Sequence, residues 1–209
     1  MAQQGLLVVV SGFSGAGKGT IMKALLDKYE NYALSVSATT RSPRVGEEHG
    51  REYFFLTEQE FEELIEKDQF IEHARYVKHY YGTPKSYVEE KMAEGHDVIL
   101  EIEIQGALNV KEKFPNALLV FVTAPTAEEL RNRLVGRGTE SAEVIEERLK
   151  RAAEEAEYMD QYDYILVNDA IDTSVEKLHS LIQSQHMQTS CNGTRIETMQ
   201  KELKELVRK

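Results

Sequence analysis

Apolar residues follow two alternating patterns along the chain. Continuous apolar runs are typical of strands buried on both faces of a sheet, and they occur at Leu6–Val10, Leu118–Val122 and Tyr164–Val167. Val98–Ile104, which alternates at its end, predicts a further strand. Apolar residues in helical spacing follow, at residues 20–29, 105–113, 127–135, 142–159 and 175–186. Because strands that alternate with helices build parallel sheets with right-handed crossovers, the pattern predicts an α/β fold with a parallel sheet flanked by helices.

Two segments interrupt this alternation. Residues 36–95 hold short apolar segments at 36–40 and 53–56, and an aromatic segment at 73–81 that is typical of a hairpin. We expect a small insertion with an antiparallel sheet there. Residues 126–157, rich in Arg and Glu around Gly136, predict a second, helical insertion hinged at glycines. The core then comprises residues 1–35, 96–125 and 158–187, and residues 188–209 form a tail.

Several helix starts are marked by a hydroxyl residue followed three positions later by glutamate, the pattern of a capping box. The pairs are Thr57 with Glu60, Ser86 with Glu89, Thr126 with Glu129, and Thr173 with Glu176. In the polar tail, helical spacing of apolar residues continues at Ile196, Met199, Leu203 and Leu206. The tail is therefore either a dimer element or a solvated helix, and the chain a monomer or a homodimer.

A glycine-rich segment lies between the first predicted strand and the first predicted helix. Its spacing fits G-x-x-x-x-G-K, in which glycines let backbone N–H groups surround phosphate oxygens at a helix N-terminus. A hydroxyl directly after the lysine is missing, so Thr20 or water must serve Mg²⁺. The segment predicts a nucleotide-phosphate site built from Gly12, Phe13, Ser14, Gly15, Ala16, Gly17, Lys18, Gly19 and Thr20.

Two carboxylates, Glu101 and Glu103, lie near the C-terminal end of the second predicted core strand. Alternation along a strand would place both on one face, near the carboxyl end of the sheet where ligands bind in open α/β folds. We expect them to hold metal-bound water or to read the donor edge of a base.

Charge and cysteine content narrow the class of protein. The chain has 209 residues, with 25 Lys and Arg against 36 Asp and Glu, for a net charge of −11. This balance disfavours nucleic-acid and membrane partners. Apolar runs are shorter than the ~18 residues of a membrane span, no secretory signal is visible, and Cys191 is a single cysteine. These features predict a cytoplasmic protein.

A resemblance to a known family is carried by the phosphate segment, by Ser37–Arg44 and by Gly136–Thr139. On these segments, the chain resembles the guanylate kinase family from about Gly5 to His186. The resemblance implies a P-loop NTPase-type sheet, with residues 36–95 as a GMP-binding domain and 126–157 as a lid. It also implies transfer of the γ-phosphoryl group of ATP to GMP, with dGMP as a further acceptor and Mg²⁺ as the cofactor of ATP.

The resemblance assigns an acceptor site. Guanidinium groups suit a phosphate dianion, and an ionised carboxylate accepts from the N–H donors of guanine but is mismatched to adenine. The residues implied in GMP binding are Ser37, Arg41, Arg44, Tyr53, Glu72, Tyr81, Thr83 and Glu103.

The resemblance also assigns a donor site. ATP would bind the phosphate segment together with Arg133 and Asn168, and the catalytic residues would be Lys18, Arg41, Arg137 and Arg148. No direct protein ligand is expected for Mg²⁺, which would be held through water near Thr20 and Glu101.

Two positions depart from the family pattern, and three other classes compete with it. Phe13 stands where the family usually has Pro, and Glu103 where many members have Asp. The competing interpretations are another nucleoside monophosphate kinase, a non-catalytic phosphopeptide-binding module and a P-loop GTPase. Glu72 argues against the first and Lys18 with the lid arginines against the second. The GTPase is disfavoured because its Lys-Ser/Thr pair and base-reading motif are absent.

Overall fold

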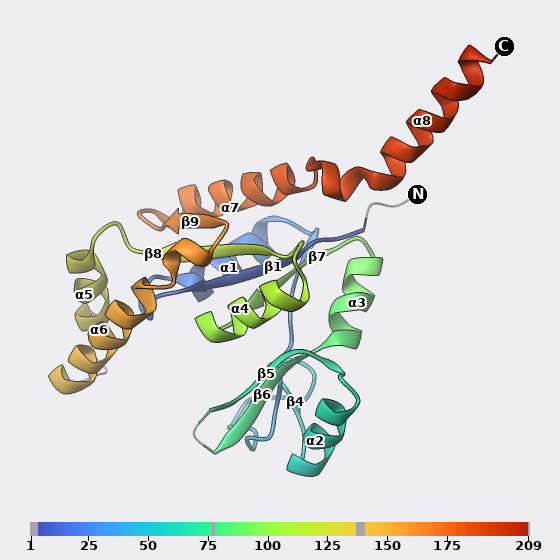
Figure 1. Ribbon diagram of the computed structural model, residues 1–209. Coiled ribbons are helices and arrows are strands. Elements are labelled where there is room, and N and C mark those ends of the chain that lie inside the picture. Colours follow the sequence, from blue (N-terminus) through green and yellow to red (C-terminus); the bar gives the residue numbers. More distant parts are fainter. Residues whose placement is uncertain (1–3, 77, 137–140, 209) are drawn as a thin grey trace.

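A five-stranded parallel sheet forms the centre of the molecule (Figure 1). The computed structural model describes residues 4–76, 78–136 and 141–208. In spatial order the strands are β2 (Tyr32–Leu34), β7 (Asp97–Glu101), β1 (Leu7–Gly12), β8 (Leu118–Thr123) and β9 (Tyr164–Val167). All neighbouring pairs are parallel, which confirms the predicted fold class. β2 was not predicted, because three residues are too few to show a periodic pattern.

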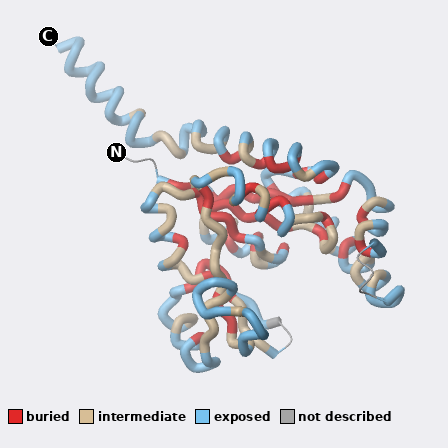
Figure 2. The backbone as a smooth tube through the Cα atoms, turned by 180° about the vertical axis from the view of Figure 1, so that it is seen from behind, coloured by how far each residue is buried: buried red, intermediate tan, exposed pale blue. Residues whose placement is uncertain are grey.

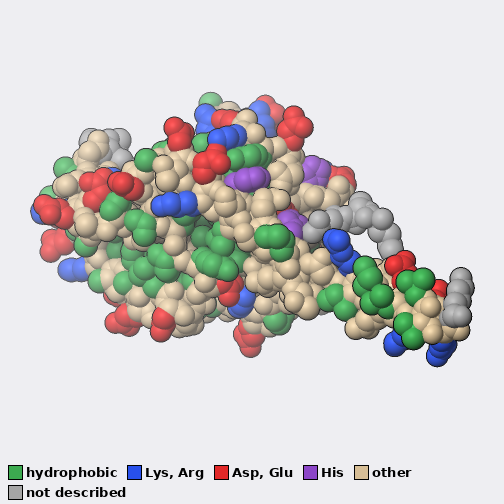
Figure 3. Space-filling view, turned by 90° about the horizontal axis from the view of Figure 1, so that it is seen from above, with side chains coloured by type: hydrophobic (Ala, Val, Ile, Leu, Met, Phe, Trp, Pro, Cys, Tyr) green, Lys and Arg blue, Asp and Glu red, His purple; other side chains and the backbone are tan. Residues whose placement is uncertain are grey.

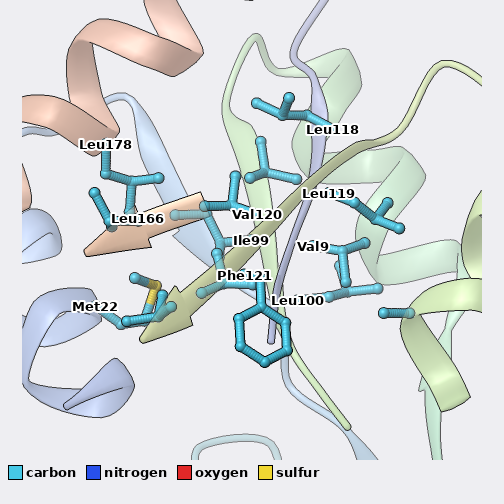
Figure 4. Close-up of a cluster of buried hydrophobic side chains, with 14 of the residues drawn as sticks. Val9, Met22, Ile99, Leu100, Leu118, Leu119, Val120, Phe121, Leu166 and Leu178 are labelled. Carbon is cyan, nitrogen blue, oxygen red and sulfur yellow. The ribbon is translucent and has the colours of Figure 1, made fainter. Parts of the chain in front are cut away.

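Helices cover both faces of this sheet, as the crossovers require. α1 (Lys18–Lys28) and α7 (Ile171–Gln185) lie side by side on one face, and α4 (Ile104–Lys113) covers the other (Figure 1). Val8, Val9 and Val10 of the central strand are completely buried. Figure 4 shows Met22 of α1 and Leu178 of α7 beside the strand residues of this cluster. The buried residues form a continuous band through the sheet (Figure 2).

A second, four-stranded sheet lies below the first in Figure 1. Its order is β4 (Phe54–Phe55), β3 (Ala38–Thr39), β6 (His79–Pro84) and β5 (Phe70–Tyr76), with α2 (Glu58–Glu66) against it. The sheet was expected to be antiparallel, but β3 and β4 pair in parallel. Its buried core is small: Ala38, Phe61 and Phe70. α3 (Lys85–Ala93) leads from this sheet back to the first.

The predicted capping boxes have different outcomes. Thr57 and Glu60 form the complete box at α2, and Thr126 Oγ1 accepts from Glu129 N at 3.0 Å. The other two predictions are wrong. α3 begins at Lys85, after Pro84, so Ser86 lies inside the helix. α7 begins two residues before Thr173, because Ile171 packs against the core.

The remaining helices extend from the body. α5 (Ala127–Gly136) and α6 (Ala142–Ala156) lie beyond one end of the large sheet, and short 3₁₀ turns occur at Met159–Gln161 and Thr189–Asn192. α8 (Gly193–Val207) projects away, and Figure 3 shows apolar side chains on its surface. Among the described residues, no helix combines the length and apolar character needed to cross a membrane.

Candidate active site

Backbone geometry builds the phosphate loop between β1 and α1. Gly12, Gly15 and Gly17 have φ of 142°, 88° and 94°, values that favour glycine. A Cβ on Gly12 would lie 2.0 Å from the carbonyl oxygen of Val122. Gly17 caps α1, so the loop ends at a helix N-terminus, which favours anions. Lys18 Nζ donates to the Gly12 carbonyl at 2.7 Å and therefore lies over the loop.

Side chains from distant segments support this loop. Phe13 is buried and contacts Phe121 edge to face, with ring centroids 4.9 Å apart. The aromatic residue that replaces the family's usual Pro thus anchors the loop in the core. From below, the buried Asn168 side chain donates to the Ala16 carbonyl at 2.7 Å and accepts from Ser174 Oγ at 3.0 Å. Asn168 was expected beside ATP, and its side chain lies under the phosphate loop.

The helix α6 also contacts the loop. Arg148 Nη1 donates to Ser14 Oγ at 2.6 Å, which brings one predicted catalytic arginine onto the phosphate loop. Arg133 on α5 pairs with Glu129 on its own helix at 2.7 Å. Arg137 and the neighbouring Thr139 lie outside the described residues.

A cationic cluster lies at the edge of the second sheet. The Arg41 guanidinium contacts the rings of Tyr53 and Phe55, at 5.4 and 5.8 Å from their centroids, and the Tyr53 and Tyr81 rings are 6.1 Å apart. Arg44 is exposed a few residues away. The structure therefore brings Arg41 together with the tyrosines expected at an acceptor phosphate, and the Arg44 side chain is exposed nearby.

A buried carboxylate lies on the adjoining strands. Glu72 on β5 is only 8% exposed and accepts from Thr83 Oγ1 at 2.8 Å. Burial raises the pKa of Glu72, and the hydrogen bond from Thr83 partly opposes that rise. Ser37 is half-buried at the start of β3. An acidic group placed in this way can accept from paired N–H donors of a ligand.

The expectation that Glu101 and Glu103 share one strand face is wrong. β7 ends at Glu101, and Glu103 is the N-cap of α4. α4 approaches Glu72, whose Oε2 would lie 3.3 Å from a Cβ on Gly106. Glu72 and Glu103 therefore border the same region of the molecule. Glu103 also forms an ion pair of 2.9 Å with Arg151 of α6, a contact that no local sequence pattern identifies.

The donor set around the phosphate loop suits Mg²⁺ bound together with a nucleotide. Among the described residues there is no cluster of three or more His, Cys, Asp or Glu that could hold a metal alone. Mg²⁺ usually keeps several waters and binds one or two carboxylates plus substrate phosphates. Glu101 provides such a carboxylate close to Gly19. Desolvation by the surrounding protein atoms raises the pKa of Glu101, and the positive charge of Lys18 partly opposes that rise.

Comparisons with known proteins agree on one family. The family model described as guanylate kinase matches residues 4–185. A guanylate kinase from Caldanaerobacter subterraneus subsp. tengcongensis is 55% identical over 180 residues, which cover 86% of this chain and 87% of the relative. A guanylate kinase from Lactococcus lactis subsp. lactis is 52% identical over 186 residues, with 89% and 91% covered.

The fold leads to the same family. The crystal structure of guanylate kinase from Anaplasma phagocytophilum matches with a TM-score of 0.69 and 32% sequence identity, and the match covers 91% of this chain and 90% of that chain. The chain therefore belongs to the guanylate kinase family of nucleoside monophosphate kinases, as the phosphate loop and the Ser37–Arg44 segment predicted.

Proposed function

We propose that this chain binds ATP on the phosphate loop and GMP between the second sheet and α4, and transfers the γ-phosphoryl group between them. The observation that carries this assignment is the buried Glu72–Thr83 pair, which lies on the same small sheet as the Arg41 cluster. The Glu72 carboxylate suits the N–H edge of guanine, and the Arg41 guanidinium suits a phosphate.

Discrimination of the base follows from hydrogen-bond polarity. An ionised carboxylate only accepts, so Glu72 can pair with the N1–H and N2–H groups of guanine. Adenine would leave buried acceptor atoms without donors, and sites of this kind reject a wrong partner strongly. Ser37 precedes the β3 residue that pairs with Gly82, next to Thr83, and Glu103 is the N-cap of α4. Both would complete the contacts to the base.

Phosphoryl transfer depends on positioning and charge neutralisation more than on covalent chemistry. The loop N–H groups and Lys18 would hold the transferring phosphate, and Arg148 of α6 would add positive charge from the lid side. Arg41 and Arg44 would hold the acceptor phosphate. Mg²⁺, held through water near Glu101 and Thr20, would supply further charge neutralisation at the ATP phosphates. Closure of α5 and α6 over the site would exclude water as a competing acceptor.

An acceptor scan tests this function. ADP release from ATP is measured with GMP, dGMP, AMP, UMP and CMP in turn. We expect stimulation by the guanine nucleotides alone; equal stimulation by all acceptors would contradict the assignment.

The Glu72→Gln variant should lose its preference for GMP over AMP, because one acceptor oxygen becomes a donor. Glu66→Gln, an exposed change at the end of α2, is the matched control.

A further inference from the structure

Glu47 links Arg41 and Arg44, the two arginines of the cationic cluster, which is called the acceptor cluster from here on. Its Oε1 atom accepts from Arg41 Nη2 at 3.0 Å, and its Oε2 atom accepts from the backbone N–H of Arg44 at 2.8 Å. The backbone N–H of Glu47 donates to the Arg44 carbonyl at 3.0 Å, which closes a turn. One carboxylate therefore ties a guanidinium group and a main-chain segment together.

This pair differs from the other ion pairs of the same loop. The side chains of Arg41 and Glu47 are only 14% and 18% exposed, whereas Arg51, which pairs with Glu48 and Glu52, is 53% exposed. Exposed pairs contribute little because water screens them and the side chains lose entropy. The Arg41–Glu47 pair is sheltered, and the rings of Tyr53 and Phe55 contact the same guanidinium.

The contacts fix the guanidinium without using all its donors. Arg41 Nη1 donates to the Ser42 carbonyl at 2.8 Å, and Nη2 donates to Glu47. A guanidinium group has five N–H donors in a rigid plane, so it can be held by these two bonds and still donate to a phosphate oxygen. The bond from Arg41 lowers the pKa of Glu47, with the Arg44 N–H as the second cause, so Glu47 stays ionised at neutral pH.

We propose that Glu47 is a positioning residue for the acceptor phosphate, which sets the Arg41 guanidinium and the Arg44 backbone before GMP binds. This inference rests on the proposed function. Side chains that are already ordered lose less entropy when a ligand binds. The opposing effect is repulsion between the Glu47 carboxylate and a phosphate dianion. If repulsion dominated, Glu47 would compete with GMP for Arg41, and its removal would strengthen GMP binding. The two roles thus predict changes of opposite sign.

The test compares Glu47→Ala and Glu47→Gln in the full chain. Steady-state assays give kcat and the KM values for GMP and ATP, and calorimetry gives the Kd for GMP. Loss of a hydrogen bond to a charged group should raise the KM and Kd for GMP about tenfold in the alanine variant. The glutamine variant should show a smaller increase, because its single carbonyl oxygen can replace only part of the bridge. The KM for ATP should change by less than about twofold.

Glu48→Ala is the matched control, because Glu48 is adjacent and its exposed side chain pairs with Arg51. This variant should leave all these constants unchanged. If the Glu47 variants leave the KM for GMP unchanged or lower it, the positioning role is wrong. An equal rise in the KM for GMP and for ATP also overturns it, because that pattern indicates general damage to the fold. Circular dichroism checks folding, and the glutamine variant carries the test if the alanine variant unfolds. Absence of GMP-dependent ADP release in the unmodified chain would instead refute the proposed function.

Discussion

The two regions that we propose bind phosphate are built differently. The loop at Gly12–Thr20 uses backbone N–H groups and lies on the large core, held by Phe13 and Asn168. The acceptor cluster uses side chains on a small sheet whose buried core is Ala38, Phe61 and Phe70. A backbone cradle recognises phosphate, which all nucleotides share, whereas side chains can also read a base. If the proposed function is right, selectivity for the base belongs to the part of the protein with the smaller buried core.

Removing the charge of the donor site should have the largest effect. Lys18→Met keeps the length of the side chain and removes its positive charge. Since charge stabilisation dominates phosphoryl transfer, we expect kcat to fall by about 10³- to 10⁵-fold, while the Kd for GMP changes little. Kinetics and GMP calorimetry on the same preparation measure both. Loss of GMP binding with kcat preserved would show that the two regions are not independent.

Weakening the small core should impair GMP binding and leave ATP binding intact. Phe61 is completely buried and stacks on Phe70 and Tyr80, with ring centroids 4.4 and 5.1 Å away. Phe61→Ala should cost about 3–5 kcal/mol and abolish GMP binding, while the phosphate loop still binds an ATP analogue. Denaturant unfolding and calorimetry follow the two effects. Phe121→Ala, a change in the large core, should damage both sites; if Phe61→Ala also destroys ATP binding, the cores are one unit.

Removing the support of the loop should have a smaller and more local effect. Asn168→Ala leaves the Ala16 carbonyl and the Ser174 hydroxyl without their bonds, at a cost of about 1–3 kcal/mol. The KM for ATP should rise about tenfold and that for GMP should stay constant. The neighbouring exposed change Asp169→Ala is the control. Equal rises in both KM values would contradict a local role.

The smallest effect concerns stability and pH. Burial raises the pKa of Glu72 in the folded chain. The contribution of Glu72 to the free energy of unfolding is therefore fully present below its ordinary pKa, and it is lost as pH rises through the raised value. Glu72→Gln should therefore stabilise the fold slightly at neutral pH, with the difference disappearing in acid. Urea unfolding at pH 7 and pH 4 tests this sign. A glutamine variant that is less stable at pH 7 would contradict the burial cost.

The features predicted from sequence are those that local patterns encode. Glycine spacing identified the phosphate loop, and apolar runs identified most strands of the parallel sheet. Contacts between distant segments have no local signature, which is why Asn168 under the loop and Arg151 on Glu103 could not be predicted. Alternation from residue 101 to 103 looks the same for a continuing strand and for a helix cap, so the end of β7 was misplaced. The Thr173 box failed because burial of Ile171 outweighed a local capping preference.

The position of β1 between β7 and β8 affects how the chain acquires its donor site during synthesis. β1 is synthesised well before both of its partner strands, which lie at Asp97–Glu101 and Leu118–Thr123. Asn168 follows later still. Such distant pairings delay folding. A nascent chain that ends before Asn168 should hold nucleotide poorly, so the capacity to bind ATP should emerge only after Asn168 has been synthesised.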